Sequence, residues 1–267
     1  MRERRELAPI VFRVLGGLLL AYLIAPLIYL IFRVGWHEMA SSYANPRTVR
    51  AVEVSLLTSF ISVCVMTFFG VPLGYLLARP GFKGRQLLIS LVFVPMALPP
   101  LVGGVLLLLV YGPYGMVGAL FEKHGFQLVN SLAGIVLAQV FVAAPYIVIA
   151  SISAFGRVDE RLEKAAATLG DTQWRTFRRV SLPLAWPGIL AGVMLAWVRT
   201  LGEFGATLIM AYHPNTVPVF LWVQLTSEGL MAALPLALFL VVLALVAVGA
   251  VYLFGQLASA DPPQRRV

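Results

Sequence analysis

The chain has 267 residues, of which 60% are hydrophobic and 12% are charged, and its formal net charge is +8. Soluble domains are usually about 45–50% apolar and about a quarter charged. The composition therefore excludes an ordinary soluble domain and indicates an integral membrane protein. The positive charge does not point to nucleic acid, because the basic residues lie in short segments between apolar runs, where lysine and arginine set membrane orientation.

Six apolar segments are long enough to cross a bilayer, since a helix needs about 20 mainly apolar residues to do so. They lie near residues 10–33, 53–78, 86–111, 131–155, 185–212 and 232–257. The predicted fold class is an all-α integral membrane protein with six transmembrane helices. The first apolar run follows the basic start MRERRE and is too long for a typical signal-peptide core, so we expect a retained helix.

The basic residues also predict how the chain is oriented. With the N-terminus inside, fourteen lysines and arginines fall on cytoplasmic segments and four on external ones, which is the usual bias. Both ends are then cytoplasmic. We expect a cytoplasmic tail, first helix and external loop over 1–50, a main transmembrane domain over 51–257 and a cytoplasmic tail over 258–267. The external segment 112–130 should be a loop with a short interfacial helix.

The third apolar segment is interrupted by prolines. Residues 86–121 carry no charge and include Pro95, Pro99 and Pro100. Proline removes a backbone donor and clashes with the preceding turn, so we predict a kink near 95–100. Irregular backbone at membrane depth survives only where protein or a water-filled cavity surrounds it. Pro99 and Pro100 are therefore candidates for lining a transport route, and the alternative is a kink that only serves helix packing.

The fifth apolar segment contains two opposite charges, Arg199 and Glu203. Four residues apart on a helix, they would share one face. An isolated charge at the bilayer centre costs about 2.5–3.5 kcal/mol on insertion scales, so each should face protein or water. We favour a structural ion pair beside the pathway, and the alternative is a gate that contacts an anion directly. Gly202 and Gly205 would allow bending or close helix approach.

The polar stretch 160–183 lies between two apolar runs and is longer than a simple connection needs to be. It predicts two short helices joined at Gly170, with Asp159 capping the first and Asp171 or Thr172 starting the second. The apolar positions of the two helices are Leu162, Ala165, Ala166 and Leu169, and then Trp174, Phe177 and Val180. An element of this shape is suited to being held by another protein.

The spacing of this stretch resembles the EAA loop of ABC importer permeases, written E-A-A-x-x-x-G, nine residues, then I-x-L-P. The matching residues are Glu163 (one place early), Ala165, Ala166, Gly170, Leu182 and Pro183. The resemblance implies a type I ABC importer permease fold. It also implies that the loop, over 156–184, couples the permease to a cytoplasmic ATPase and follows its motions during alternating access.

A second string, Arg-Thr-Leu-Gly-Glu-Phe-Gly-Ala-Thr over 199–207, resembles the molybdate and tungstate branch of these permeases. It implies import of an oxyanion, with molybdate or tungstate favoured over sulfate, thiosulfate, another anion or ferric iron. The following segment, 213–219, is shorter than in many such relatives. Pro99, Pro100, Arg199, Glu203 and Gly205 are the candidate pathway or gate residues.

The resemblance also implies partners. These are cytoplasmic ABC ATPase subunits, an extracytoplasmic substrate-binding protein and a second permease copy, most simply as a homodimer. The chain has no Gly-x-x-x-x-Gly-Lys-Ser/Thr loop, so ATP and magnesium should be bound by the ATPase, and we expect no cofactor on this chain.

Enzymatic and metal-binding functions are disfavoured. The sequence has neither His-Glu-x-x-His nor Gly-x-Ser-x-Gly, and His37, His124 and His213 lie far apart, so we expect neither an intramembrane enzyme nor a metal site. The single cysteine, Cys64, excludes an intrachain disulfide. A membrane scaffold that transports nothing is the remaining alternative of a different class.

Overall fold

The computed structural model describes residues 2–79 and 81–259, and every regular element in those ranges is a helix. The elements are α1 (Arg2–Arg33), α2 (Trp36–Ala44), α3 (Pro46–Ala78), α4 (Arg85–Ala97), α5 (Pro100–Tyr111), α6 (Gly118–Glu122), α7 (Leu132–Gly156), α8 (Glu160–Thr168), α9 (Gln173–Thr176), the π-helical turn η1 (Phe177–Ser181), α10 (Leu182–Leu201), α11 (Gly205–Met210), α12 (Val217–Ser227) and α13 (Leu230–Ser259).

Within the described ranges, five stretches are long and apolar enough to cross a membrane, and the bent pair α4–α5 makes a sixth if it is counted as one span. The five are Val11–Arg33, Pro46–Ala78, Leu132–Gly156, Gln173–Leu201 and Leu230–Ala250. These stretches correspond to the predicted spans. The short helix expected over 112–130 is also present, as α6. Most of the expected tail, 258–267, lies outside the described residues.

The break predicted near 95–100 is confirmed, but it is far sharper than a proline kink, because the chain bends by 110° between α4 and α5. Leu98 and Pro99 both have extended backbone, with ψ of 140° and 133°. Each precedes a proline, and the residue before a proline is pushed out of the helical region. Two successive prolines therefore end one helix and start another.

The fifth span also differs from the prediction of one helix over 185–212. Helix α10 ends at Leu201, and α11 begins at Gly205, so the span is broken at 202–204. Helix α12 follows, an apolar helix of 11 residues that was not predicted. Since α10 ends where a glycine follows, Gly202 marks the start of the break.

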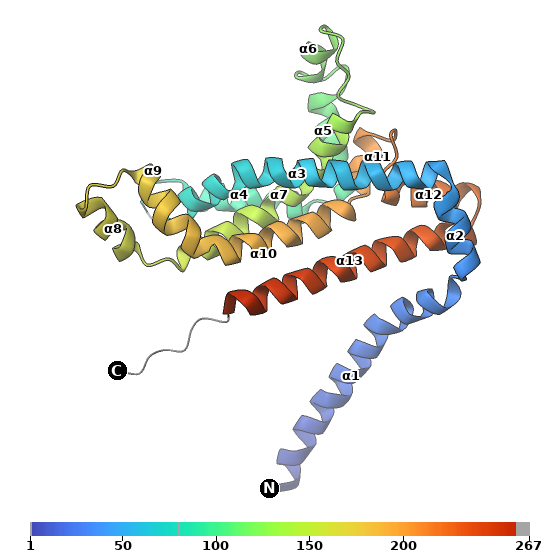
Figure 1. The fold of residues 1–267 in the computed structure, drawn as a ribbon, viewed down its shortest axis with the longest axis horizontal. Helices are drawn as coiled ribbons and strands as arrows, with labels where there is room; N and C mark the ends of the chain where they lie inside the picture. The colour runs from blue at the N-terminus through green and yellow to red at the C-terminus, as the bar shows by residue number, and fades with distance from the viewer. Residues whose placement is uncertain (1, 80, 260–267) are drawn as a thin grey trace.

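The core lies between α3, α7 and α10, which run side by side (Figure 1). Its buried side chains include Met66, Ile147, Phe155 and Ile189. Small residues let the helices approach closely, and a Cβ on Gly74 would clash with the side chain of Ser151. Close packing of this kind replaces the hydrophobic driving force that lipid cannot supply.

The elements that carry the candidate residues lie at the two ends of the bundle (Figure 1). Helices α8 and α9 lie at one end of the bundle, and α2, α11 and α12 lie at the other. Helix α1 projects away from the bundle, and none of its apolar window, Val11–Arg33, is buried. The polar loop and the break in the fifth span are therefore far apart along the bundle.

Candidate functional site

The loop predicted from residues 160–183 is a capped helical hairpin. The Asp159 side chain accepts a hydrogen bond from the Arg161 N–H (2.9 Å) and caps α8. At the other end Gly170 has a φ of 88°, a left-handed conformation that glycine adopts without strain. Its N–H donates to Ala167 (3.0 Å), and the Asp171 N–H donates to Ala166 (3.1 Å), which is a Schellman motif. The predicted turn at Gly170 is confirmed.

The second half of the hairpin begins as predicted, with the Thr172 hydroxyl accepting from the Arg175 N–H (3.4 Å). The ring of Trp174 stacks on Phe177 at 5.5 Å. Instead of ending as a separate helix, the chain continues through η1 into α10. Pro183 is the second residue of α10 and directly follows the π-helical turn. The second helix is therefore continuous with the fifth span.

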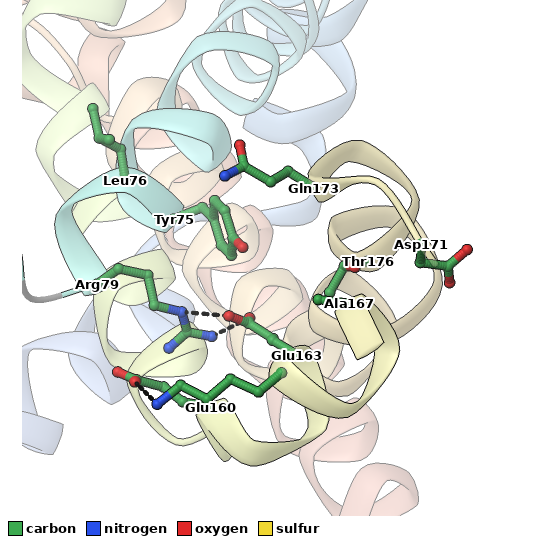
Figure 2. Close-up of a pocket in the computed structure, with 10 residues that line it drawn as sticks. Tyr75, Leu76, Arg79, Glu160, Glu163, Ala167, Asp171, Gln173 and Thr176 are labelled. Carbon is green, nitrogen blue, oxygen red and sulfur yellow. Dashed lines mark hydrogen bonds and ion pairs between the residues drawn. The ribbon is translucent and has the colours of Figure 1, made fainter. Parts of the chain in front are cut away.

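Glu163 turns into the protein and pairs with Arg79, which follows the end of α3 (Figure 2). The Arg79 Nε–H donates to Glu163 Oε2 (3.0 Å), and Nη2 donates to Oε1. Ser181 Oγ also donates to Oε1 (2.5 Å), and Arg79 Nη1 donates to the Phe155 carbonyl (3.0 Å). This group, which we call the Glu163 cluster (Arg79, Phe155, Glu163 and Ser181), joins α8 to α3, α7 and η1.

The electrostatics of the Glu163 cluster favour the paired state. Burial alone would lower the pKa of the Arg79 guanidinium, but the hydrogen bonds and charge of Glu163 outweigh it, and the pKa is raised above its ordinary value. Like any arginine, Arg79 is charged throughout the physiological pH range. The side chains of Arg79 and Glu163 are only 19% and 15% exposed, and bidentate pairing of this kind is among the stronger protein hydrogen bonds.

Sequence reasoning identified Glu163 but missed Arg79 and Ser181. Arg79 is 84 residues away along the chain, and neither residue belongs to a local pattern that points to Glu163. A cavity of about 400 Å³ lies beside the pair, lined by Tyr75, Arg79, Glu163, Ala167 and Thr176 among others (Figure 2). Residues of both α3 and α8 line the cavity, and the Arg79–Glu163 pair joins the two elements in its wall.

The hairpin also exposes apolar side chains. Leu169 is 89% exposed, Trp174 is 67% exposed and Leu162 is 48% exposed, and Ala165 is exposed beside them. We call these four residues the apolar patch. Of the other predicted loop residues, Ala166 is buried, Leu182 packs against the core and Pro183 is exposed. Exposed apolar surface of this kind is typical of a site that contacts another protein or a membrane.

The charges in the fifth span form the predicted ion pair, with Arg199 Nη1 at 2.6 Å from Glu203 Oε2. The expectation that both lie on one helix is wrong, because α10 ends at Leu201 and Glu203 lies in the break. Glu203 is 1% exposed, and its Oε1 accepts from the Ala206 N–H (2.9 Å) in the first turn of α11. Glu203 thus holds the start of α11 while Arg199 balances its charge.

The remaining candidate pathway residues meet at the same place. A Cβ on Gly205 would lie 2.8 Å from Pro100 Cβ, and one on Gly104 would lie 2.8 Å from Ile209 Cβ. The absence of side chains at these glycines lets α5 pack against α11. Pro99, Pro100, Glu203 and Gly205 are therefore grouped where the two broken spans touch, whereas Glu163 and Gly170 lie at the other end of the bundle.

A bundle of membrane-spanning helices with two touching breaks and a capped hairpin at one end agrees with the predicted class, a membrane transport permease. The chain belongs to the family of binding-protein-dependent transport system inner membrane components, whose family model matches residues 70–259. The predicted family is confirmed, and the chain is a transport permease rather than an enzyme.

Three relatives show where the chain falls within the family. A probable molybdenum ABC transporter permease protein of Haloferax volcanii is 44% identical over 241 residues, which is 90% of this chain and 88% of the relative. The molybdate/tungstate transport system permease protein WtpB of Thermococcus kodakarensis is 36% identical, over 91% of this chain and 94% of its own length. A probable sulfate transport system permease protein of Chlorella vulgaris is 37% identical, over 68% of each chain.

The fold resembles that of a chain from a bacterial alginate ABC transporter, solved in complex with a periplasmic protein that holds an alginate pentasaccharide. The TM-score is 0.73, and the match covers 96% of this chain and 95% of the other. The sequences are 17% identical, so the likeness concerns the fold alone. It confirms the predicted importer permease architecture.

Proposed function

We propose that this chain is the membrane-spanning subunit of an ATP-driven importer that moves molybdate or tungstate into the cytoplasm. The observation that carries the choice of cargo is the similarity to relatives named for molybdenum, molybdate and tungstate, which extends over about nine-tenths of the chain. The relative named for sulfate matches a smaller share of the chain, at 68%. An oxyanion is therefore the cargo class, and molybdate or tungstate is the favoured member.

Cytoplasmic ATPase subunits dock on the apolar patch. Its exposed leucines and tryptophan offer contact area, and the excess of basic residues around it supports a cytoplasmic location for this end of the bundle. Both chain ends are then cytoplasmic. ATP and magnesium are bound by the ATPase, and this chain contributes no cofactor site to the cycle.

The Glu163 cluster transfers the movement of the ATPase to the spans. Helix α8 lies between the apolar patch and the bridge to Arg79, so displacement of α8 pulls on the ends of α3 and α7. Those helices form the core with α10, whose far end leads into the break at 202–204. Motion at the hairpin thereby changes the packing of α5 against α11, which opens or closes the route.

A second copy of the chain completes the route, and an extracytoplasmic binding protein delivers the anion at the end that carries α2, α11 and α12. Pro99, Pro100 and Gly205 set the backbone course along the route. Arg199 and Glu203 act mainly as architecture, because Glu203 is buried and already engaged by Arg199 and the Ala206 N–H.

The test is uptake by the chain reconstituted into vesicles with its ATPase and binding protein. Labelled molybdate, tungstate and sulfate are compared with and without internal ATP. Saturable, ATP-dependent uptake of molybdate or tungstate that sulfate barely inhibits supports the proposal. Uptake of sulfate alone would refute molybdate or tungstate as the cargo but would leave the assignment as a permease intact. A chain that neither binds the ATPase nor changes its activity would be a scaffold.

A further inference from the structure

Helix α3 carries a row of buried hydroxyl groups toward α7 and α10. Thr58, Ser59 and Ser62 are all fully buried. Inside a membrane bundle no water is available to satisfy such groups, so each needs a protein partner. Ser59 accepts from the Trp197 Nε1–H of α10 (3.2 Å), and the other two hydroxyls meet one side chain of α7.

That side chain is Gln139, which is 1% exposed. Its Oε1 accepts from Ser62 Oγ (2.7 Å), and its Nε2 lies 3.3 Å from Thr58 Oγ1 and 3.4 Å from the carbonyl oxygen of Thr200. A carbonyl can only accept, so the amide nitrogen must face Thr200. Thr58 gives its own proton to the Val54 carbonyl (2.8 Å), which leaves its oxygen free to accept. The donors and acceptors of Gln139 are thus matched across three helices.

The carbonyl of Thr200 has a special position. It belongs to the last turn of α10, where carbonyls lose their helical partners, and the break begins two residues later. It also accepts from the Glu203 N–H (3.1 Å). On the far side of the break, Glu203 accepts from the Ala206 N–H. Glu203, inside the break, therefore holds the start of α11. Gln139 joins the end of α10 to α7 and α3.

We propose that Gln139 is a positioning residue for transport, which fixes the break at 202–204 relative to α3 and α7. This inference rests on the proposed function and deepens it. The two helices that Gln139 ties to the break are the same two that Arg79 ties to Glu163 at the other end. Gln139 is the point where movement of α3 and α7 reaches the broken span.

The test compares Gln139→Leu with Ser151→Ala. The leucine side chain is apolar and has a volume near that of glutamine, but it makes none of the three hydrogen bonds. Ser151 is a buried α7 hydroxyl with no hydrogen-bond partner among the described residues, so Ser151→Ala is the matched control. Both are measured in the reconstituted complex, by hydrogen exchange of the backbone amides over 198–206 and by uptake and ATP hydrolysis.

Loss of a buried hydrogen bond changes an opening equilibrium by about two- to tenfold. We expect amide exchange at Gly202 and Glu203 to accelerate about fivefold in Gln139→Leu and to stay unchanged in Ser151→Ala. Maximal uptake per folded complex should fall about tenfold, with the half-saturating anion concentration within about twofold of wild type and more ATP hydrolysed per anion. A lower folded yield with wild-type turnover and coupling would show a purely structural role and overturn the inference.

If Gln139→Leu fails to fold, Ser62→Ala removes a single bond from the same group, and about twofold faster exchange is expected. Unchanged amide exchange in Gln139→Leu and Ser62→Ala overturns the inference even if uptake falls. The exchange measurement needs no cargo, so it is separate from the test of the proposed function. If the wild-type complex imports none of the anions, the proposed cargo is refuted. The role of Gln139 is then still decided by the exchange measurement.

Discussion

Replacing Glu163 with glutamine tests the bridge between the hairpin and the spans. The substitution keeps the shape of the side chain but removes the negative charge to which Arg79 and Ser181 donate hydrogen bonds. Hydrogen bonds to charged groups contribute about 1.5–3 kcal/mol each in net terms. Because the pair is partly open to water at 19% and 15% exposure, we take about 2 kcal/mol for the loss of the bidentate contact. That corresponds to about a 30-fold shift toward a detached α8.

The assay is ATP hydrolysis and anion uptake by the reconstituted complex, at equal amounts of assembled protein. Binding of the ATPase should persist in Glu163→Gln, since the apolar patch is untouched. Stimulation of hydrolysis by the loaded binding protein should be lost, and uptake should fall at least about tenfold. Glu160→Gln is the matched control, because Glu160 lies on the same helix and only meets Lys164 at 3.7 Å in a largely exposed pair. Such pairs contribute about 0–1 kcal/mol, so uptake should stay within about twofold of wild type.

A double-substitution cycle sharpens the test. If Arg79 and Glu163 act together, Arg79→Gln combined with Glu163→Gln should cost less than the sum of the two single losses. Wild-type uptake by Glu163→Gln, or strictly additive losses in the cycle, would refute the idea that this pair carries the coupling.

Three further substitutions probe other parts of the chain. Gly170→Val should uncouple hydrolysis from uptake, because a β-branched residue resists the φ of 88°, whereas Gly170→Asn, which tolerates that conformation, should stay near wild type; equal uptake by both would contradict our account of the turn. Glu203→Gln leaves Arg199 unpaired, and breaking a buried pair costs about 3–5 kcal/mol, so folded yield by size-exclusion chromatography should drop severalfold; an unchanged yield would show that the charges do not need one another. Leu169→Asp should leave the thermal stability of the isolated chain unchanged, since the side chain is 89% exposed, but should weaken ATPase binding about tenfold in a pull-down titration; undiminished binding would remove Leu169 from the docking surface.

The features that could be predicted from the sequence are local ones. Asp159, Gly170 and Thr172 specify the caps and turn of the hairpin by their own backbone and side-chain preferences, and the structure has them as expected. Pro99 and Pro100 located the break in the third span for the same reason. Its 110° angle depends on where α5 finds a partner, and that partner is α11, more than one hundred residues later.

The features that could not be predicted join distant parts of the chain. The pairing of Arg79 with Glu163 spans 84 residues, and Gln139 meets Ser62 across 77. No periodicity or spacing relates such positions, because contact is decided by how the helices pack. The pairing of Arg199 with Glu203 could be predicted from their spacing of four residues. The end of α10 between them could not, because the surrounding run is apolar and Gly202 alone does not specify a helix end.

The Glu163 cluster also bears on which ATPases this permease can work with. Both carboxylate oxygens of Glu163 are occupied by residues of its own chain, so a docking ATPase has no need to supply a matching cation there. If the ATPase docks on the apolar patch as proposed, its recognition depends on the fit of Leu162, Leu169 and Trp174 into the ATPase surface. An ATPase borrowed from another importer should therefore be accepted when its surface has the right contour, and subunit exchange between transporters should be governed by shape more than by charge.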